Sequence, residues 1–535
     1  MTMAPQRICI VGGGAAGVAL LWLLAKEQRK HPARQFEITL VHDDVVKNRN
    51  GQPQPGVGSL GGHSRSVAVE VNGIEYWIDL GVQMIAPDMY PNLMCMLKLD
   101  EFRGVKMDDV PLRVSCTFPP DTHGNPVYWG NFPSYQTTPL YQQRAADAGK
   151  FEALLKQQQL NPGSLKTLLD AQQSHFGNYK AFEDYFLGPY LSIMNGYGAA
   201  LLDQIYVPEA AFLWNHDYAS FTDWSSNFAR FHYGSMQWVQ TMAANAIKLM
   251  PPGSVEIITG AKVTEVIPGP PQPSVVWKIN GTSHGPEVFD SVVLTTDMQA
   301  NGDILIRDDN PLKDFYKQYV GQDVWHLIPG FCYLHQDESI FAPGTPTPFE
   351  ETLQFTAYWA TQKQPFDLEK SWTTYSYKNL MGVDDPDFDY YLTMYGFDPR
   401  NEADIPKPAN PIDPTPMNWV HGMWLPTFMW NQKMKMRNAQ GISPFVGPLP
   451  LQKNTGVYFA GNNLTMDSEE GALVSAMALG RYAFNIDAQS YVLAKTWPLD
   501  TRAITARVFY LAMYNIMFPG INFNVADIVK SMFGM

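Results

Sequence analysis

The chain has 535 residues, of which 45% are hydrophobic and 17% are charged, and its formal net charge at pH 7 is −14. This length allows two domains, or one large interleaved domain, with ample apolar surface for a core. The negative charge excludes nucleic acid as an expected partner, because phosphate binding requires a positive surface.

The N-terminal segment 7–28 predicts a strand, a glycine turn and an apolar-faced helix. In such a turn the first glycine permits the tight bend, the second lets the backbone approach a pyrophosphate, and the third lets the helix pack on the strand. Phosphates then lie at the helix N-terminus, where N–H groups and the dipole favour negative charge. The predicted dinucleotide site comprises Gly12, Gly14, Ala15, Ala16 and Gly17.

A second buried strand is predicted over 36–44, and it ends with His42, Asp43 and Asp44. A dinucleotide site usually has an acidic residue at this point to bind the ribose hydroxyls. Asp43 is the preferred candidate and His42 the alternative, although a solvated acidic turn would look the same. A third apolar element is predicted over 76–87.

The middle and end of the chain predict further elements. Segment 149–160 reads as a helix within a stretch rich in proline and aromatic residues, and 321–450 reads as irregular. The remaining predictions are a helix over 234–250, one strand over 254–269, strands over 275–281 and 289–297, and a strand, loop and helix over 457–487. Patterns of strands and helices typical of a nucleotide-binding domain recur at the start, the middle and the end of the chain. We therefore expect a discontinuous cofactor domain with an inserted second domain.

The four cysteines, at positions 9, 95, 116 and 332, include no CxxC pair, so neither a metal site nor a dithiol redox centre is expected. They are interpreted as buried thiols in a reducing compartment. The first predicted strand begins so close to the N-terminus that no secretory signal is expected, and the protein is predicted to be cytoplasmic.

Segment 56–87 carries Gly61-Gly62, then Arg65, then Asp79-Leu80-Gly81. Here the chain resembles the flavin-containing amine oxidase superfamily, which includes phytoene-desaturase-like enzymes and has a Gly-Gly-Arg turn followed by an Asp-Leu-Gly motif. The resemblance implies that Gly61 and Gly62 face the cofactor and that Arg65 approaches its pyrophosphate. It also implies that the isoalloxazine is lined by Gly81, Val82, Gln83 and Met84.

The resemblance extends to the middle and C-terminal segments. Val263 stands where the backbone of a family strand receives the adenine. The family closes its cofactor domain with Ala-Gly-acid, a loop, Glu-Gly-Ala and a helix whose N–H groups face the flavin, where they stabilise negative charge. The matching residues here are Gly461, Asn462, Glu470, Gly471 and Ala472.

Together these matches imply an α/β fold with a Rossmann-like FAD-binding domain in three segments and an inserted α+β substrate domain. The FAD-binding domain is predicted to comprise 1–90, 234–300 and 441–490. The substrate domain is predicted to comprise 91–233 and 301–440, followed by an apolar helical tail over 491–535. No cysteine follows Cys332, so the FAD is expected to be non-covalent.

Three departures set the chain apart from ordinary amine oxidases. Asn462 replaces the usual acid, and Ser468 stands where monoamine oxidases place an aromatic-cage tyrosine. The lysine that many amine oxidases keep near the flavin is missing from segment 323–335, which contains His326. An ordinary small-amine oxidase is therefore not the expected function.

Aromatic residues in the second domain suggest an apolar substrate cavity, although plain core packing is the more common reason for such clusters. Arg230 could bind a substrate carboxylate, but a structural ion pair is the preferred interpretation. The catalytic candidates are Glu469 and His326 as acid–base groups and Trp430 as a cage aromatic. The cavity candidates are Trp224, Phe228, Phe231, Trp424, Phe428 and Trp430.

The predicted function is hydride transfer to flavin N5 from a bulky, partly apolar amine or amino-acid-derived substrate. The first alternative is desaturation, or redox-neutral double-bond isomerisation, of an apolar substrate. The second is a non-enzymatic binding protein on the same fold. The expected partner is an aromatic or apolar small molecule. Membrane-surface contact through the tail is less favoured than packing on the chain's own body, and the sequence does not indicate an oligomeric state.

Overall fold

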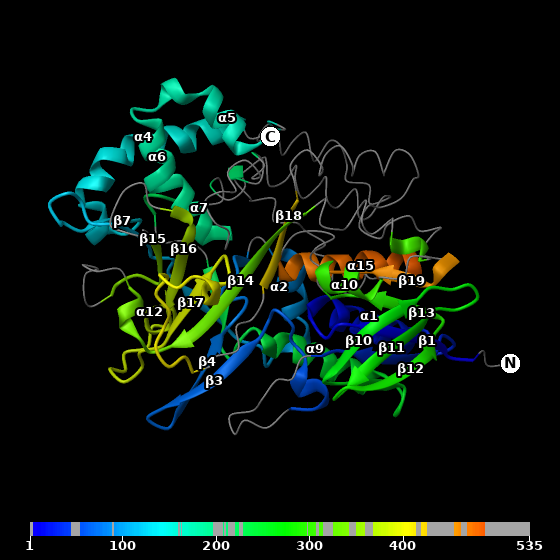
Figure 1. Cartoon of the computed structure of the whole chain (residues 1–535). Coiled ribbons are helices and arrows are strands. Elements are labelled where there is room, and N and C mark those ends of the chain that lie inside the picture. The colour runs from blue at the N-terminus through cyan, green and yellow to red at the C-terminus, as the bar shows by residue number, and fades with distance from the viewer. Residues whose placement is uncertain are drawn as a thin grey trace.

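The structure is a computed structural model with a mixed α/β fold. It describes residues 4–43, 54–87, 90–158, 161, 163–195, 207, 210–211, 214, 220–223, 228–296, 298–305, 310–313, 325–341, 349–358, 367–412, 419–424, 454–461 and 468–486. Figure 1 shows two parts, one built around β1, β13 and α1 and the other around β15, β16 and β17, with the long strand β14 running between them.

The first part contains a five-stranded sheet in the order β19-β13-β1-β2-β9, in which every neighbouring pair is parallel. Residues 8–11 of β1 are all buried, as expected for a parallel strand covered on both faces. The carboxyl ends of these strands therefore meet at one edge. The strands are β1 (Gln6–Val11), β2 (Phe36–Val41), β9 (Val255–Ile258), β13 (Ser291–Leu294) and β19 (Val457–Phe459).

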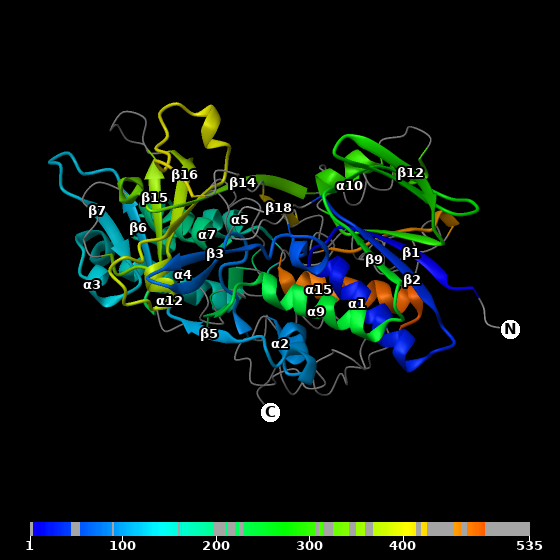
Figure 2. The same cartoon turned by 90° about the horizontal axis from the view of Figure 1, so that it is seen from below.

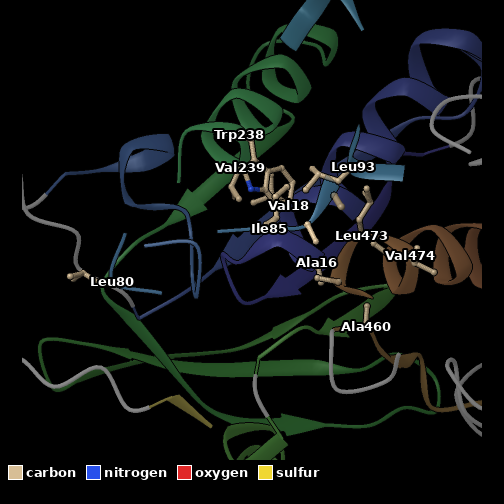
Figure 3. Packing of buried hydrophobic residues seen from close by; sticks show 14 of the residues in the cluster. Ala16, Val18, Leu80, Ile85, Leu93, Trp238, Val239, Ala460, Leu473 and Val474 are labelled. Carbon is tan, nitrogen blue, oxygen red and sulfur yellow. The ribbon is translucent and has the colours of Figure 1, made fainter. Parts of the chain in front are cut away.

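Three helices pack side by side against one face of this sheet (Figure 2): α1 (Ala15–Lys30), α9 (Met236–Leu249) and α15 (Glu469–Phe484). Helix α1 contacts both of the others. In Figure 3, Ala16 and Val18 of α1 point toward Trp238 of α9 and Leu473 of α15. Arg34, just after α1, donates to the carbonyl of Phe484 at 2.5 Å, so α1 and α15 run parallel and both begin at the carboxyl edge of the sheet.

Smaller elements surround this core. A three-stranded sheet lies on the opposite side of the five-stranded sheet from the helices (Figure 2) and has the order β10 (Ala261–Ile267), β11 (Ser274–Ile279) and β12 (Thr282–Val288). Two antiparallel pairs are β3 (Ser66–Val71) with β4 (Ile74–Asp79), and β5 (Met107–Val110) with β8 (Phe228–Phe231). The short helix α2 (Pro91–Leu97) packs on α15, and the short helix α10 (Met298–Ile304) packs on β10.

The second part contains a seven-stranded sheet in the order β18-β14-β17-β16-β15-β6-β7. Its strands come from two distant stretches of the chain, 114–130 and 325–424. They are β6 (Val114–Phe118), β7 (Val127–Gly130), β14 (Trp325–His335), β15 (Leu353–Tyr358), β16 (Asp367–Ser376), β17 (Tyr391–Tyr395) and β18 (Trp419–Trp424).

A row of polar side chains crosses this sheet and is buried. Ser115, Gln354, Thr374 and Thr393 occupy paired positions on four successive strands. The hydroxyls of Thr374 and Thr393 lie 2.9 Å apart, and His335 Nε2 lies 2.8 Å from Thr393 Oγ1. These bonds satisfy groups that burial alone would penalise.

Helices cover the other face of the seven-stranded sheet. Trp129 of β7 is fully buried and stacks on Phe186, with ring centroids 4.1 Å apart and planes at 4°. Its indole N–H donates to the carbonyl of Tyr185 at 2.6 Å. The helices of this part are α3 (Pro133–Gln136), α4 (Pro139–Gln158), α5 (Leu165–Ala171), α6 (Tyr179–Phe182), α7 (Gly188–Asn195) and α12 (Tyr377–Met381).

Two sequence predictions about these elements are wrong. The single strand predicted over 254–269 is two strands in different sheets, because Gly260 adopts a positive φ of 63° and turns the chain between β9 and β10. The stretch 321–450, read as irregular, supplies β14 to β18. Its strands are interrupted by proline-containing connections, which hid the alternating pattern. Among the described residues, no helix is long and apolar enough to cross a membrane.

Candidate cofactor site

The predicted glycine turn connects β1 to α1. Gly12 has a φ of 117°, and a Cβ there would lie 2.5 Å from Thr295 Oγ1 at the end of β13. A Cβ on Gly17 would overlap the carbonyl oxygen of Gly12. Thr295 Oγ1 donates to the carbonyls of Val11 and Gly12 at 2.9 and 3.1 Å, which fixes the turn. Glycine at 12 and 17 is therefore required by the fold itself.

Gly14 differs from these two glycines. Its φ of −82° suits any residue, and among the described residues only the Cα of Gly62, at 3.8 Å, lies near an added Cβ. Gly62, in turn, has a φ of 57°, and a Cβ there would lie 2.8 Å from the Cα of Gly14. The N–H of Gly61 donates to the carbonyl of Gly13 at 3.0 Å. The predicted Gly-Gly turn thus lies directly against the N-terminus of α1, backbone to backbone.

His42 and Asp43 follow β2 at the same edge of the sheet. His42 is buried, and its Nε2 lies 2.9 Å from Ser59 Oγ. Since the Ser59 hydroxyl donates to Gly56 at 2.6 Å, it accepts the bond from His42, which therefore carries its proton on Nε2. Asp43 is exposed. The structure places both ribose candidates beside the turn.

Val263 lies close to the same group. It belongs to β10, the edge strand of its sheet, and it precedes a β-bulge. The N–H of Ala261 donates to the carbonyl of His42 at 2.9 Å, which joins the start of β10 to the end of β2. The predicted adenine strand is thereby brought next to the predicted ribose residues.

The Asp79-Leu80-Gly81 segment runs from the glycine turns toward the second part of the molecule. The N–H of Leu80 donates to the carbonyl of Arg65 at 2.8 Å, and Arg65 is half-buried. Gln83 is buried and its Nε2 lies 3.7 Å from the sulfur of Met394 on β17. The predicted isoalloxazine wall, Gly81 to Met84, therefore runs from the glycine turns to the seven-stranded sheet.

Further bonds hold this wall and the preceding strand β4 against β8 and against α12 of the second part. Ile85 exchanges two backbone hydrogen bonds of 2.8 Å with Ala229 of β8. The Tyr377 hydroxyl donates to the carbonyl of Asp79. Arg230 is buried, lies 3.4 Å from Asp108 and donates to the carbonyl of Trp77 at 2.8 Å. The ion pair expected as the structural role of Arg230 is thus present.

Helix α15 brings the C-terminal motif to the same edge. Gly461 follows β19, and its N–H donates to Ser475 Oγ at 2.8 Å. Ser468 is the N-cap of α15, where its hydroxyl accepts from the N–H of Gly471 at 2.9 Å. The residue that replaces the cage tyrosine therefore has a defined role in starting this helix. Ala472, one turn into the helix, is buried.

Glu470 and Glu469 point to different neighbours. Glu470 accepts three bonds from the N-terminus of α2, namely from Asn92 N at 3.0 Å, Asn92 Nδ2 at 2.5 Å and Leu93 N at 3.0 Å. Glu469 accepts from Ser64 Oγ at 2.6 Å and from Trp238 Nε1 at 3.1 Å. Burial raises the pKa of each carboxyl to about 7. The paired glutamates thus bind α15 to its neighbours on both sides.

Some predicted residues cannot be placed. Asn462 and Trp430 lie outside the described residues, as do Trp224 and Phe428 among the cavity candidates. His326 lies on β14 and Trp424 lies on β18, but neither side chain belongs to the described part of the structure. Phe231 is core, and Phe228 is half-buried. Within the described parts of the chain, no group of three or more His, Cys, Asp or Glu could hold a metal.

Sequence reasoning missed the neutral side chains that fix the site. Ser59, Ser64, Asn92, Trp238 and Thr295 hold the histidine, the two glutamates and the glycine turn. A serine or threonine beside a glycine motif has no distinctive spacing, so none could be recognised in advance. Thr295 alone had a signal, because it lies within the segment 289–297 that was matched to the family.

Comparison with solved structures shows that the chain has the fold of the flavin amine oxidase superfamily. A putrescine oxidase variant from a redesign of cofactor binding aligns with a TM-score of 0.51 at 14% identity, covering 90% of this chain and 99% of its own. An oxidoreductase from Methanosarcina mazei aligns with a TM-score of 0.50 at 13% identity, covering 89% and 99%. A CLA-producing fatty acid isomerase from P. acnes aligns with a TM-score of 0.51 at 13% identity, covering 89% and 98%.

No protein-family model matches the sequence, and no curated protein matches it. The structural matches nevertheless confirm the predicted resemblance at the level of the fold. The substrates named for these neighbours belong to them.

Proposed function

We propose that this chain is a flavoprotein oxidoreductase that binds FAD non-covalently and takes a hydride from a bulky, partly apolar amine or amino-acid-derived substrate. The proposal rests on the shared fold and on the gathering of the predicted motifs at one edge of a parallel sheet. Ligands of open α/β sheets bind at this edge.

Gly14 is the observation that carries the proposal. The packing of the described residues leaves room for a side chain at this position, with a conformation that any residue can adopt. A glycine there is explained by a ligand that must approach the backbone at the N-terminus of α1. A pyrophosphate is such a ligand, since it is held by backbone N–H groups and the helix dipole.

The residues present fit FAD. The pyrophosphate would lie at Gly14 and Ala15, beside the Gly61–Gly62 turn and Arg65. The ribose would be held by His42 or Asp43, and the adenine by the backbone of β10 at Val263. The parallel helix α15 presents a second N-terminus at the same edge, which favours negative charge on the flavin.

FAD would supply a hydride acceptor at flavin N5. The protein's part is to position the substrate and exclude water. Gly81 to Met84 would form one wall, and the seven-stranded sheet meets it at Met394, next to the buried side chain of Gln83. Such surroundings suit an apolar substrate body with few polar contacts.

Desaturation or redox-neutral isomerisation of an apolar substrate is the second candidate. It is favoured by the lack of lysine in β14, whose sequence is WHLIPGFCYLH, and by the equal structural likeness to a fatty acid isomerase. A non-enzymatic binding protein is the third candidate. It would have no use for the second helix N-terminus at the cofactor edge.

The absorption spectrum of the purified chain tests the proposal. We expect a yellow protein that releases FAD on acid precipitation. The Gly14→Ala variant should fold with unchanged stability and lose most of its FAD, because the methyl group displaces the pyrophosphate.

The matched control is Gly149→Ala, at a position within α4 where no atom of the described residues lies within 4 Å of an added Cβ, and this variant should keep full FAD occupancy. A colourless chain that takes up no FAD contradicts the proposal, and full occupancy in Gly14→Ala contradicts the placement. Anaerobic bleaching by amines, amino acids and polyenes then separates amine oxidation from reactions at carbon–carbon bonds.

A further inference from the structure

The connection between β16 and β17 in the second part runs alongside the hairpin of β3 and β4. It comprises α12 and the loop 382–390, and α12 lies beside the hairpin in both views (Figure 1 and Figure 2). The hairpin turns at Asn72 and Gly73, whose φ values of 52° and 79° suit a tight two-residue turn. At its base, one strand follows the Gly61-Gly62 turn and the other leads into the predicted isoalloxazine wall.

The loop 382–390 holds the tip and the middle of the hairpin. At the tip, Asn72 Nδ2 donates to Asp385 Oδ2 and Asp387 Oδ2, each at 3.1 Å. Halfway along β4, the ring centroids of Tyr76 and Phe388 lie 4.5 Å apart, and Phe388 is fully buried. The bonds at the tip are exposed, so the buried ring contact contributes more to holding the hairpin against the loop.

The base of the hairpin is held at a single peptide group from two sides. The Tyr377 hydroxyl of α12 donates to the carbonyl of Asp79. On the other side, the N–H of Leu80 donates to the carbonyl of Arg65 at 2.8 Å. The carbonyl of Asp79 and the N–H of Leu80 belong to the same peptide group, which is planar. One bond from each side therefore fixes the plane of this peptide and the direction in which the chain continues to Gly81.

The bond from Tyr377 is buried and well supported. Neither Tyr377 nor Asp79 has any exposed surface. The backbone N–H of Tyr377 donates to the carbonyl of Tyr390 at 3.0 Å, immediately before β17, which fixes the start of α12 on the sheet. Burial raises the pKa of the Tyr377 phenol well above its usual range, so the hydroxyl keeps its proton and remains a donor. Loss of this bond at a buried carbonyl carries a cost that solvent cannot offset.

We infer that Tyr377 is a positioning residue for the flavin: its hydroxyl sets how the wall from Gly81 to Met84 lies against the isoalloxazine. The inference rests on the proposed function, because this wall is where the flavin would lie. The seven-stranded sheet also meets the wall at Met394, whose sulfur lies 3.7 Å from Gln83 Nε2. The β16–β17 connection and β17 thus contact the chain just before the wall and within it, which couples the second part to the cofactor.

Tyr377→Phe tests the inference, because it keeps the buried ring and removes only the hydroxyl. In the purified full-length protein, amide hydrogen exchange over segment 79–85, followed by mass spectrometry, should become about fivefold faster or more, since a buried hydrogen bond is lost. The variant should retain FAD, because the glycine turns are unchanged. Its visible flavin absorption band should shift from the wild-type position, because the wall no longer lies in the same place against the isoalloxazine.

Tyr395→Phe is the matched control. Tyr395 is a buried tyrosine of β17, and its hydroxyl donates to the carbonyl of Pro406 at 2.6 Å. This variant loses the same kind of bond from the same sheet, but it should keep the wild-type exchange over 79–85 and the wild-type flavin band. Equal changes in the two variants would overturn the inference, because they would report a general loosening of the sheet.

The exchange measurement needs no cofactor, so it separates the inference from the proposed function. A chain that takes up no FAD contradicts the proposed function, whereas faster exchange over 79–85 in Tyr377→Phe alone still supports the hold of Tyr377 on this peptide. Unchanged exchange in Tyr377→Phe overturns the inference whether or not FAD binds. Faster exchange in a holoprotein with an unchanged flavin band overturns the positioning role.

Discussion

The two parts of the molecule are stabilised around their central sheets by different kinds of contact. At the glycine turns of the first part the backbone is closely approached: Gly14 lies against Gly62, and Gly12 lies against the hydroxyl and the backbone of Thr295. In the second part, side chains meet side chains, as in the stack of Trp129 on Phe186 and the polar row that includes Thr374 and Thr393. Close backbone approach dictates glycine at fixed positions, whereas aromatic packing accepts many arrangements.

This difference explains why only one part could be interpreted from sequence. The spacing of the glycines indicates where two backbone segments approach each other closely. A cluster of aromatic residues in the sequence does not indicate how the rings will pack. Substitutions in each part test whether the two kinds of contact stabilise the chain differently, and replacement of a buried tryptophan should have the largest effect.

Trp129→Ala should destabilise the chain most. The change removes a fully buried indole, its stack on Phe186 and its bond to the carbonyl of Tyr185. Replacing a core tryptophan by alanine costs about 3–5 kcal/mol of the free energy of unfolding. Urea unfolding followed by circular dichroism measures it.

The half-buried Trp77 provides the control, and Trp77→Ala should cost much less. If the two parts are stabilised separately, folded Trp129→Ala should still retain FAD. Loss of FAD in the folded variant would show that the aromatic core also shapes the cofactor edge.

Gly17→Ala tests the first part with a single methyl group. The added Cβ would overlap the carbonyl of Gly12 and lie 2.9 Å from Thr295 Oγ1, so α1 must move away from β1. Overpacking of this kind costs about 1–3 kcal/mol. The urea midpoint should fall accordingly.

Gly480→Ala is the matched control within α15, where the nearest atoms to an added Cβ lie at 3.7 Å. In a helix interior this change should raise the free energy of unfolding by about 0.5–1 kcal/mol. Equal effects of the two substitutions would show that backbone approach does not constrain the glycine turn.

The sequence predicted the elements around the cofactor edge because their signals are local. The turn at Gly12, the strand ending at Val41 and the helix after Ser468 each occupy one short stretch. Their assembly followed from the rule that parallel strands share a carboxyl edge. The predicted cofactor roles of His42, Asp43 and Val263 remain predictions, although the structure places all three beside that edge.

The second part could not be derived in the same way. Strand β15 pairs with β6, and Thr356 is opposite Thr117 although more than 200 positions separate them in sequence. Such pairings depend on side-chain packing across the sheet, for which the sequence carries no spacing. The bonds of Glu469 and Glu470 show the same limit at the cofactor edge, because adjacent residues of one type bind different partners.

Ser468→Ala has the smallest expected effect and addresses the residue at which the chain departs from monoamine oxidases. The change removes the bond from the N–H of Gly471 and leaves the N-terminus of α15 without its cap. An N-cap serine is worth about 1 kcal/mol, so the free energy of unfolding should fall by that amount, while Ser468→Asp should keep most of it.

Ser164→Ala is the matched comparison, because Ser164 caps α5 in the second part through Thr167. Ser164→Ala should cost a similar amount but leave FAD release unchanged, whereas Ser468→Ala should also speed FAD release, since it loosens a helix that begins at the cofactor edge. Identical release rates in the two variants would mean that the capped end of α15 does not contribute to holding the cofactor.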